Sequence, residues 1–202
     1  ANLPPVVVTL GDGTVVEIEP VELPARFDDM VQSWDLNFKD TATSDFAAGQ
    51  VLGRLGASKY VLDYLCERLG ITATMDAIRA WGVKWPRATA KLIEDRANGP
   101  AVIQMMRGEV PGLIAVEPEG GKVSRAYAAA PEVEAGNVFL PHPYLAAWTQ
   151  RFVANAAAFP NAANDDDVDA FTQAIIRWQA HGGAATAAAL AVSQQTIQEM
   201  FG

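Results

Sequence analysis

Histidine and cysteine are scarce in this chain, which has two histidines and one cysteine among 202 residues. A single cysteine cannot form an internal disulfide, and Cys66 sits in the apolar stretch YVLDYLCERL, so we interpret it as a reduced core thiol. His142 and His181 are not paired with a nucleophile, and no His/Cys spacing typical of a metal site is present. These absences argue against a disulfide framework and a zinc centre.

Long apolar runs and several common enzyme motifs are also missing. No apolar run approaches the ~18 residues of a membrane-spanning helix, and the N-terminus has no signal-peptide pattern, so we expect no membrane contact. The chain has no G-x-x-x-x-G-K-[ST] loop, no G-x-S-x-G motif and no dinucleotide-binding glycine pattern. ATP hydrolysis is therefore not expected of it.

Basic residues are fewer than acidic ones, with 15 Lys and Arg against 24 Asp and Glu and a net charge of −9. This balance argues against a protein that coats nucleic acid non-specifically, because affinity for phosphate comes largely from Lys and Arg. It does not exclude a nuclease, because bound divalent cations can offset both clustered carboxylates and the substrate. Half of the residues are hydrophobic, as in a globular domain.

The hydrophobic pattern predicts one α/β domain with a mixed β-sheet flanked by helices. Residues 1–28 are predicted to form an N-terminal hairpin and linker, 29–181 the main domain, and 182–202 an alanine-rich tail. Three strand patterns with short links predict an antiparallel meander, after which helix and strand patterns alternate. The expected strands are 30–38, 46–56, 59–69, 90–97, 112–121 and 137–141, and the expected helices are 72–85, 98–110, 122–136, 143–159 and 166–181.

Two acidic residues or pairs lie in or at the end of predicted strands. Alternation places Trp34 and Leu36 on one face of their strand and Asp35 on the other. Asp35 is either a solvated acid on an edge strand or a buried carboxylate that needs a partner. In KLIEDRANGP, either Glu94 or Asp95 could share the face of Asp35, and alternation cannot choose between them without the strand register.

The segment PNAANDDDVDAFTQAI places four aspartates within five positions at a predicted helix start. Acids there gain from the helix dipole, by ~0.3–1 kcal/mol each. One or two acids satisfy a helix start, whereas further ones mostly add repulsion. The cluster is therefore either a solvated cap or one wall of a cation site, and Asp166 and Asp169 would share a helical face.

A strand aspartate, a strand-end glutamate and a helix-start aspartate together make up the carboxylate set of a two-metal phosphodiesterase. Hard oxygen ligands of this kind suit Mg²⁺ or Mn²⁺. Two such ions, held about 4 Å apart, activate a water molecule and stabilise the leaving oxygen.

The motifs that carry these acids resemble, in order and wording, the C-terminal nuclease domain of tailed-bacteriophage terminase large subunits. They are SWDLNF, SDFAAGQVLG, KLIEDRANGPAVIQMMR, VPGLIAVEPEGGKVSRAYAAAPEVEAGNVFLP and FPNAANDDDVDAFTQAI, and the resemblance spans roughly Asp29 to Trp178. It implies an RNase H-like fold and a metal-dependent endonuclease that cuts concatemeric viral DNA during genome packaging. It also implies two Mg²⁺ or Mn²⁺ ions held by three acids.

The resemblance assigns roles residue by residue. It implies catalytic acids at Asp35, Glu94 and Asp166, metal ligands at Asp35, Glu94, Asp165, Asp166 and Asp169, an accessory acid at Asp45, and a DNA-binding basic pair at Lys122 and Arg125. The alternative for the basic pair is a solvated helix start. Asn164 stands where the family motif has a histidine, so no role of that histidine is transferred.

The resemblance also implies partners and a location. The substrate would be double-stranded DNA, and the partners would be an ATPase domain in the full-length chain, the small terminase subunit and the portal protein, in the host-cell cytoplasm. The chain does not begin with methionine, and we expect it to be the nuclease part of a longer polypeptide. The alternatives are another RNase H-like nuclease, of transposase or junction-resolvase type, and a non-catalytic packaging module whose acids are only caps.

Overall fold

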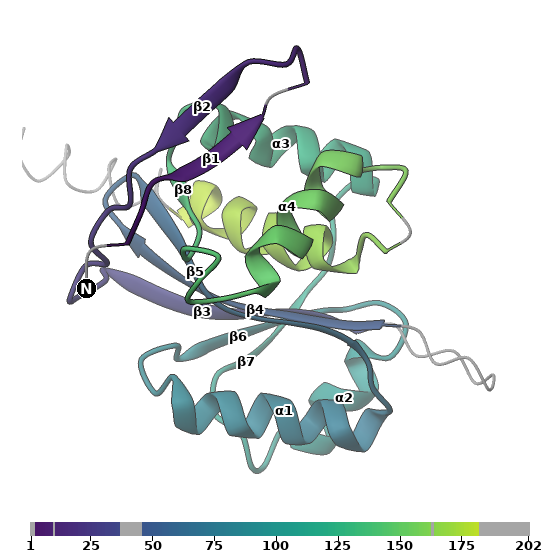
Figure 1. Cartoon of the computed structure of the whole chain (residues 1–202). Helices are drawn as coiled ribbons and strands as arrows, with labels where there is room; N and C mark the ends of the chain where they lie inside the picture. Colours follow the sequence, from purple (N-terminus) through teal and green to yellow (C-terminus); the bar gives the residue numbers. More distant parts are fainter. Residues whose placement is uncertain (1–2, 10, 37–45, 163, 182–202) are drawn as a thin grey trace, which may run out of the picture.

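A six-stranded mixed sheet with helices on both faces forms the centre of the computed structural model (Figure 1). The structure describes residues 3–9, 11–36, 46–162 and 164–181. Across the sheet the strands are β7 (Leu113–Val116), β6 (Ala90–Glu94), β3 (Asp29–Leu36), β4 (Phe46–Leu55), β5 (Ser58–Arg68) and β8 (Val138–Phe139). Strands β3, β4 and β5 form the predicted antiparallel meander, whereas β6, β7 and β8 pair in parallel with their neighbours.

Helices cover both faces of this sheet. Helices α1 (Ile71–Lys84) and α2 (Gly99–Met106) lie on one face, and α3 (Lys122–Glu134), α4 (Trp148–Ala158) and a final helix over 166–181 lie on the other (Figure 1). Helix α1 buries Thr74, Ile78 and Trp81, which recur at helical spacing. Burial on both faces explains why most residues of β3 and β4 are buried, Gln32, Ser33 and Gln50 included.

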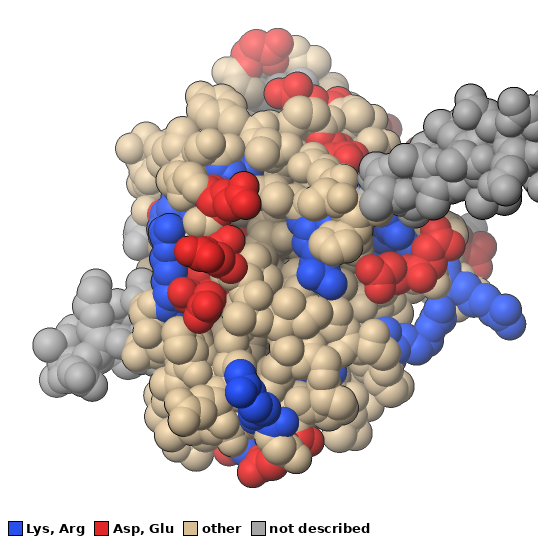
Figure 2. Space-filling view, turned by 180° about the vertical axis from the view of Figure 1, so that it is seen from behind, with Lys and Arg blue, Asp and Glu red and all other residues tan. Residues whose placement is uncertain are grey.

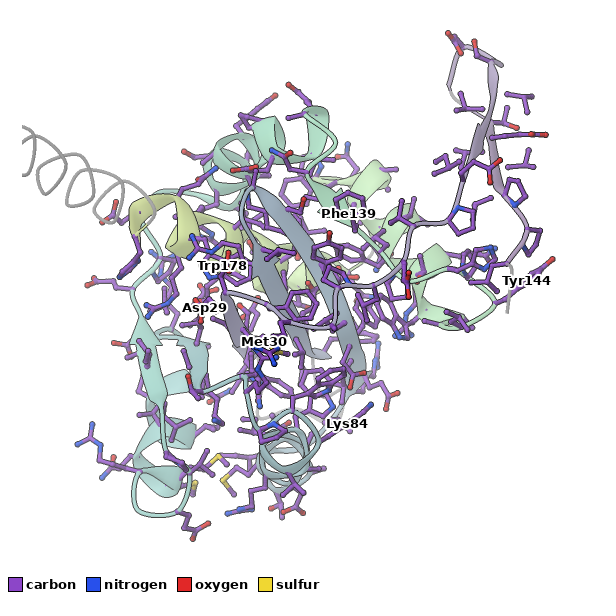
Figure 3. All side chains as sticks on the ribbon, turned by 90° about the vertical axis from the view of Figure 1, so that its left-hand side faces the viewer. Asp29, Met30, Lys84, Phe139, Tyr144 and Trp178 are labelled. Carbon is purple, nitrogen blue, oxygen red and sulfur yellow. The ribbon has the colours of Figure 1, made fainter. Side chains whose placement is uncertain are left out.

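Two hydrophobic cores result, one on each face of the sheet. On the α1 and α2 side, Trp34 packs against Trp81 with ring centroids 4.7 Å apart. On the other side, Val31 and Leu92 of the sheet pack with Phe171 and Ile175 of the final helix. Figure 3 shows the same helix reaching the start of β3, where the Trp178 indole donates a hydrogen bond of 2.8 Å to Asp29. The final helix is therefore seated along β3.

The predicted N-terminal hairpin is present and stands beside the main body (Figure 3). Strand β1 (Val6–Thr9) pairs antiparallel with β2 (Val15–Ile18). The turn uses Gly13 at a φ of 87°, and the Thr14 amide donates a 2.9 Å hydrogen bond to Asp12. All four residues of β2 are exposed, so this hairpin adds little to either core.

Some element bounds differ from the sequence expectation. Helix α4 begins at Trp148 rather than at 143, because the amides of Leu145 and Ala146 donate to the His142 carbonyl and form a separate turn. Strand β7 ends at Val116, just before Glu117-Pro118, where proline has no N–H to donate to a ladder. The predicted tail over 182–202 and the accessory acid Asp45 lie outside the described residues.

Candidate metal centre at the end of the sheet

Asp35 lies near the end of β3 and points to the side of the sheet that carries three helices. Its strand neighbours Trp34 and Leu36 belong to the opposite core, as alternation predicts. Val31, four residues earlier on the same face as Asp35, belongs to the core with the final helix. Asp35 is partly exposed and sits beside Ala48 of β4.

The strand register resolves the choice between Glu94 and Asp95. Strands β3 and β6 run parallel with Trp34 opposite Ile93, so the next residues along, Asp35 and Glu94, are neighbours. Ile93 belongs to the core under α1 and α2, so Glu94 faces the other side. Glu94, and not Asp95, therefore shares the face of Asp35.

A row of polar residues across three strands seats the start of the final helix. Ser33, Gln50 and Tyr64 are cross-strand partners in β3, β4 and β5. Gln173 donates a 2.9 Å hydrogen bond to the Ser33 hydroxyl, and Gln50 donates one of 3.0 Å to the Asp167 carbonyl. The Tyr64 hydroxyl donates a 2.7 Å hydrogen bond to the Asp167 carboxylate. These contacts fix the helix over the same face that carries Asp35 and Glu94.

Asp167 anchors the helix, a role that sequence analysis missed. Its side chain is fully buried, and the same carboxylate oxygen that meets Tyr64 also accepts a 2.8 Å hydrogen bond from Asn155. Burial, followed by the hydrogen bond to Asp167, raises the pKa of Tyr64, so its hydroxyl remains a donor. The signal was in the spacing, because Asp167 precedes the apolar residues Phe171 and Ala174 by four and seven positions.

Two aspartates of the run are paired with the basic residues of α3. The Lys122 ammonium lies 2.8 Å from Asp165 and 2.9 Å from Asp169. The Arg125 guanidinium lies 2.7 Å from Asp169 and 3.8 Å from Glu94. The predicted basic pair thus faces the acidic cluster, with the Lys122 side chain 43% exposed and that of Arg125 only 7%. Arg125 thus links Asp169 to Glu94, and Lys122 links Asp169 to Asp165.

The remaining acids are destabilised in their charged form. Burial, then the charges of Glu94, Asp166 and Asp169, raise the pKa of Asp35 well above its ordinary value. Burial raises the pKa of Glu94 as well, against the opposing charge of Arg125. Burial also raises the pKa of Asp166 to about 6, although Lys122 opposes the shift. Asp35 of β3 is thus repelled by Glu94 of β6 and by Asp166 and Asp169 of the final helix, an electrostatic setting that favours a cation.

The donor chemistry of this cluster fits Mg²⁺ or Mn²⁺, since every acidic side chain offers hard oxygen ligands. One oxygen of Asp169 is buried and has the Lys122 ammonium 2.9 Å away. Within the described part of the chain, no three Asp, Glu, His or Cys side chains stand close enough together to hold an ion as they are. Two basic side chains, those of Lys122 and Arg125, lie among these acids.

Comparison with known proteins identifies the family of this chain. Residues 32–177, more than half of the chain, match the family model of the terminase RNase H-like domain. The chain belongs to this family. The match includes both sheet acids, the basic residues of α3 and the whole aspartate run, whereas the hairpin of β1 and β2 lies outside it.

Solved structures of terminases have the same fold. The nuclease domain of the bacteriophage SPP1 large terminase, solved with bound Mn, is 17% identical with a TM-score of 0.55, and 76% of this chain and 88% of that one are covered. The large terminase of a thermophilic bacteriophage, in complex with ADP, is 11% identical with a TM-score of 0.58, covering 76% of this chain and 40% of that one. The human cytomegalovirus terminase nuclease domain is 10% identical with a TM-score of 0.54, covering 75% and 83%. The RNase H-like fold expected from the sequence is thus confirmed.

This terminase RNase H-like domain matches only part of a whole large terminase. The chain spans only 40% of the large terminase of the thermophilic phage. Among curated proteins, no match is found. None of the helices described here is long and apolar enough to cross a membrane.

Proposed function

We propose that this chain is the nuclease part of a terminase large subunit and hydrolyses phosphodiester bonds in double-stranded viral DNA during genome packaging. One observation carries the proposal: Asp35 and Glu94 are neighbours on parallel strands, on the face of the sheet to which the helix bearing Asp166 and Asp169 is hydrogen-bonded. Membership of the terminase RNase H-like family supports this reaction class, and the nuclease domain of SPP1 has been solved with bound Mn.

The proposed cofactor is a pair of Mg²⁺ or Mn²⁺ ions. Divalent ions in such a site polarise the phosphoryl oxygens and lower the pKa of a bound water. Asp35 interacts electrostatically with both Glu94 and Asp166, and it is therefore the carboxylate proposed to serve both ions. Glu94 is proposed to hold one ion and Asp166 the other, with Asp165 and Asp169 as neighbouring ligands. Arg125 orients one oxygen of Asp169, and Lys122 contacts the other at 2.9 Å.

Double-stranded DNA, the proposed substrate, must be brought to a domain that is itself negatively charged. On the face seen in Figure 2, acidic and basic side chains of the described residues lie in small mixed groups. With a net charge of −9, the isolated chain is expected to bind DNA weakly. An ATPase domain, a small terminase subunit and a portal protein in the host cytoplasm remain the proposed partners, because they would bring DNA to the site.

Asp35→Asn provides the direct test. The variant should lower the rate of Mn²⁺-dependent plasmid cleavage by at least about a hundredfold, because it removes the carboxylate shared by both proposed ions. Asp76→Asn is the matched control, since Asp76 pairs with Arg79 on the exposed surface of α1. Both variants should keep the circular dichroism spectrum of the wild type. Cleavage by Asp35→Asn at the wild-type rate would contradict the proposal.

Calorimetry separates the proposal from a non-catalytic role. A nuclease of this kind should bind Mn²⁺ stoichiometrically, and Asp35→Asn should weaken that binding. Wild-type protein that binds no Mn²⁺ would support a packaging module in which the acids act only as helix caps and ion-pair partners.

A further inference from the structure

Lys122 stands at the first position of α3 and faces the start of the final helix across the candidate metal centre. Its ammonium lies 2.8 Å from an oxygen of Asp165 and 2.9 Å from an oxygen of Asp169. The same charge also acts on Asp35 and Asp166. The positively charged side chain of Lys122 therefore lies among the carboxylates that are proposed to hold divalent ions.

Arg125, one helical turn further along α3, is held differently. Its guanidinium is enclosed and meets three acceptors, namely Asp169 at 2.7 Å, Glu94 at 3.8 Å and the Gly120 carbonyl at 3.5 Å. The Lys122 side chain is 43% exposed against 7% for Arg125. The flexible lysine stem can swing into solvent without uncovering the core, whereas removal of Arg125 would take away the enclosed partner that Asp169 shares with Glu94.

The two carboxylate oxygens of Asp169 contact different basic residues. One accepts the hydrogen bond from Arg125, and the other is buried with the Lys122 ammonium 2.9 Å away as its ion-pair partner. A divalent cation can take the place of a single ammonium on a carboxylate oxygen, because the Coulomb attraction grows with the charge of the cation. Departure of Lys122 would leave this oxygen of Asp169 open.

We propose that Lys122 is an exchangeable counter-ion of the metal centre. Its ammonium neutralises Asp165 and Asp169 while no divalent cation is bound, and it leaves them when such a cation binds. Arg125 stays on Asp169 in both states. This inference rests on the proposed metal-dependent function, and it gives Lys122 a role within the site before any contact with DNA.

The first test compares Mn²⁺ binding by calorimetry in the wild type, Lys122→Met and Lys84→Met. Because the internal competitor is lost, Lys122→Met should bind Mn²⁺ about fivefold more tightly, the size expected for one half-exposed ion pair. Lys84 is the matched control, since it pairs with Asp63 at 2.6 Å outside the site, and Lys84→Met should bind as the wild type does. Equal or weaker binding by Lys122→Met would overturn the inference.

A second test needs no variant and follows the lysine itself. The wild-type protein is acetylated with an amine-reactive ester in EDTA and in excess Mn²⁺, and labelling at each lysine is read by peptide mass spectrometry. Labelling of Lys122 should become several-fold faster with Mn²⁺, while Lys84 should be unchanged. Slower or unchanged labelling of Lys122 would refute the exchange. If the wild-type protein binds no Mn²⁺, the proposed metal-dependent function is wrong. If it binds Mn²⁺ but Lys122 labelling does not become faster, only the exchange of Lys122 is wrong.

Discussion

Asp166→Asn should stabilise the metal-free protein at neutral pH, even though it removes an acid from a helix start. Burial, and then the nearby acids against the opposing Lys122, raise the pKa of Asp166 from its ordinary value of 3.8 to about 6. A raised pKa means that the folded state binds the proton more tightly than the unfolded chain does. Ionisation of Asp166 therefore costs stability as the pH rises from 3.8 to about 6, and the cost is complete above that range.

The magnitude follows from this shift. A rise in pKa from 3.8 to about 6 corresponds to about 3 kcal/mol at 1.36 kcal/mol per pH unit. Structural relaxation and solvent screening weaken such a shift, so we expect about half of it, about 1.5 kcal/mol, to act on stability. Loss of the favourable dipole interaction at the helix start removes a further ~0.3–1 kcal/mol of the gain. The expected net effect is a stabilisation of about 0.5–1 kcal/mol.

Urea denaturation in EDTA, followed by tryptophan fluorescence, measures this effect. The difference between Asp166→Asn and the wild type should be small near about pH 4 and should reach its full size by about pH 7.5. Asp76→Asn should change stability by less than about 0.5 kcal/mol at both pH values, since its ion pair is exposed. In excess Mn²⁺ the order should reverse, because only the wild type keeps the full ligand set. An Asp166→Asn protein that is less stable than the wild type in EDTA at about pH 7.5 would refute the reasoning.

Two further predictions concern the parts that position the acids. Tyr64→Phe removes a hydrogen bond to the buried Asp167 carboxylate and should lower the free energy of unfolding by about 1–3 kcal/mol, as measured in urea; an unchanged free energy would contradict the anchoring role. Gly99→Ala adds a Cβ that would collide with the Glu94 carbonyl oxygen, so it should shift the end of β6 and weaken Mn²⁺ binding in calorimetry. Gly70→Ala is its control, because a Cβ there meets nothing within 4 Å, and equal Mn²⁺ affinity of the two variants would contradict the prediction.

The sheet acids show how far sequence patterns can reach. Alternation along one strand was enough to separate Asp35 from Trp34, because that rule depends only on local geometry. The choice between Glu94 and Asp95 depended on the pairing of β3 with β6, two strands separated by more than fifty residues. Register of this kind is set by tertiary packing, and a single strand pattern does not contain it.

Helix bounds show a similar limit. The start of the final helix was predicted correctly. An apolar stripe and acidic residues at the first positions both indicate a helix over 166–181. Helix α4 was predicted to start too early, since the segment from 143 resembles a continuous amphipathic pattern. The turn closed by His142 depends on hydrogen bonds to one carbonyl, and no periodicity signals it.

The aspartate run is best understood from the geometry of the helix that begins there. Successive residues of an α-helix are about 100° apart around its axis, so three consecutive carboxylates cannot all converge on one ion. Asp167 points into the core and holds the helix on the sheet. Asp165 and Asp169 meet the basic residues of α3, and Asp166 remains close to Asp35. Burial that raises the pKa of Asp35 and Asp166 also strengthens their attraction for a cation, so the metal-free fold and the metal affinity are set by the same residues.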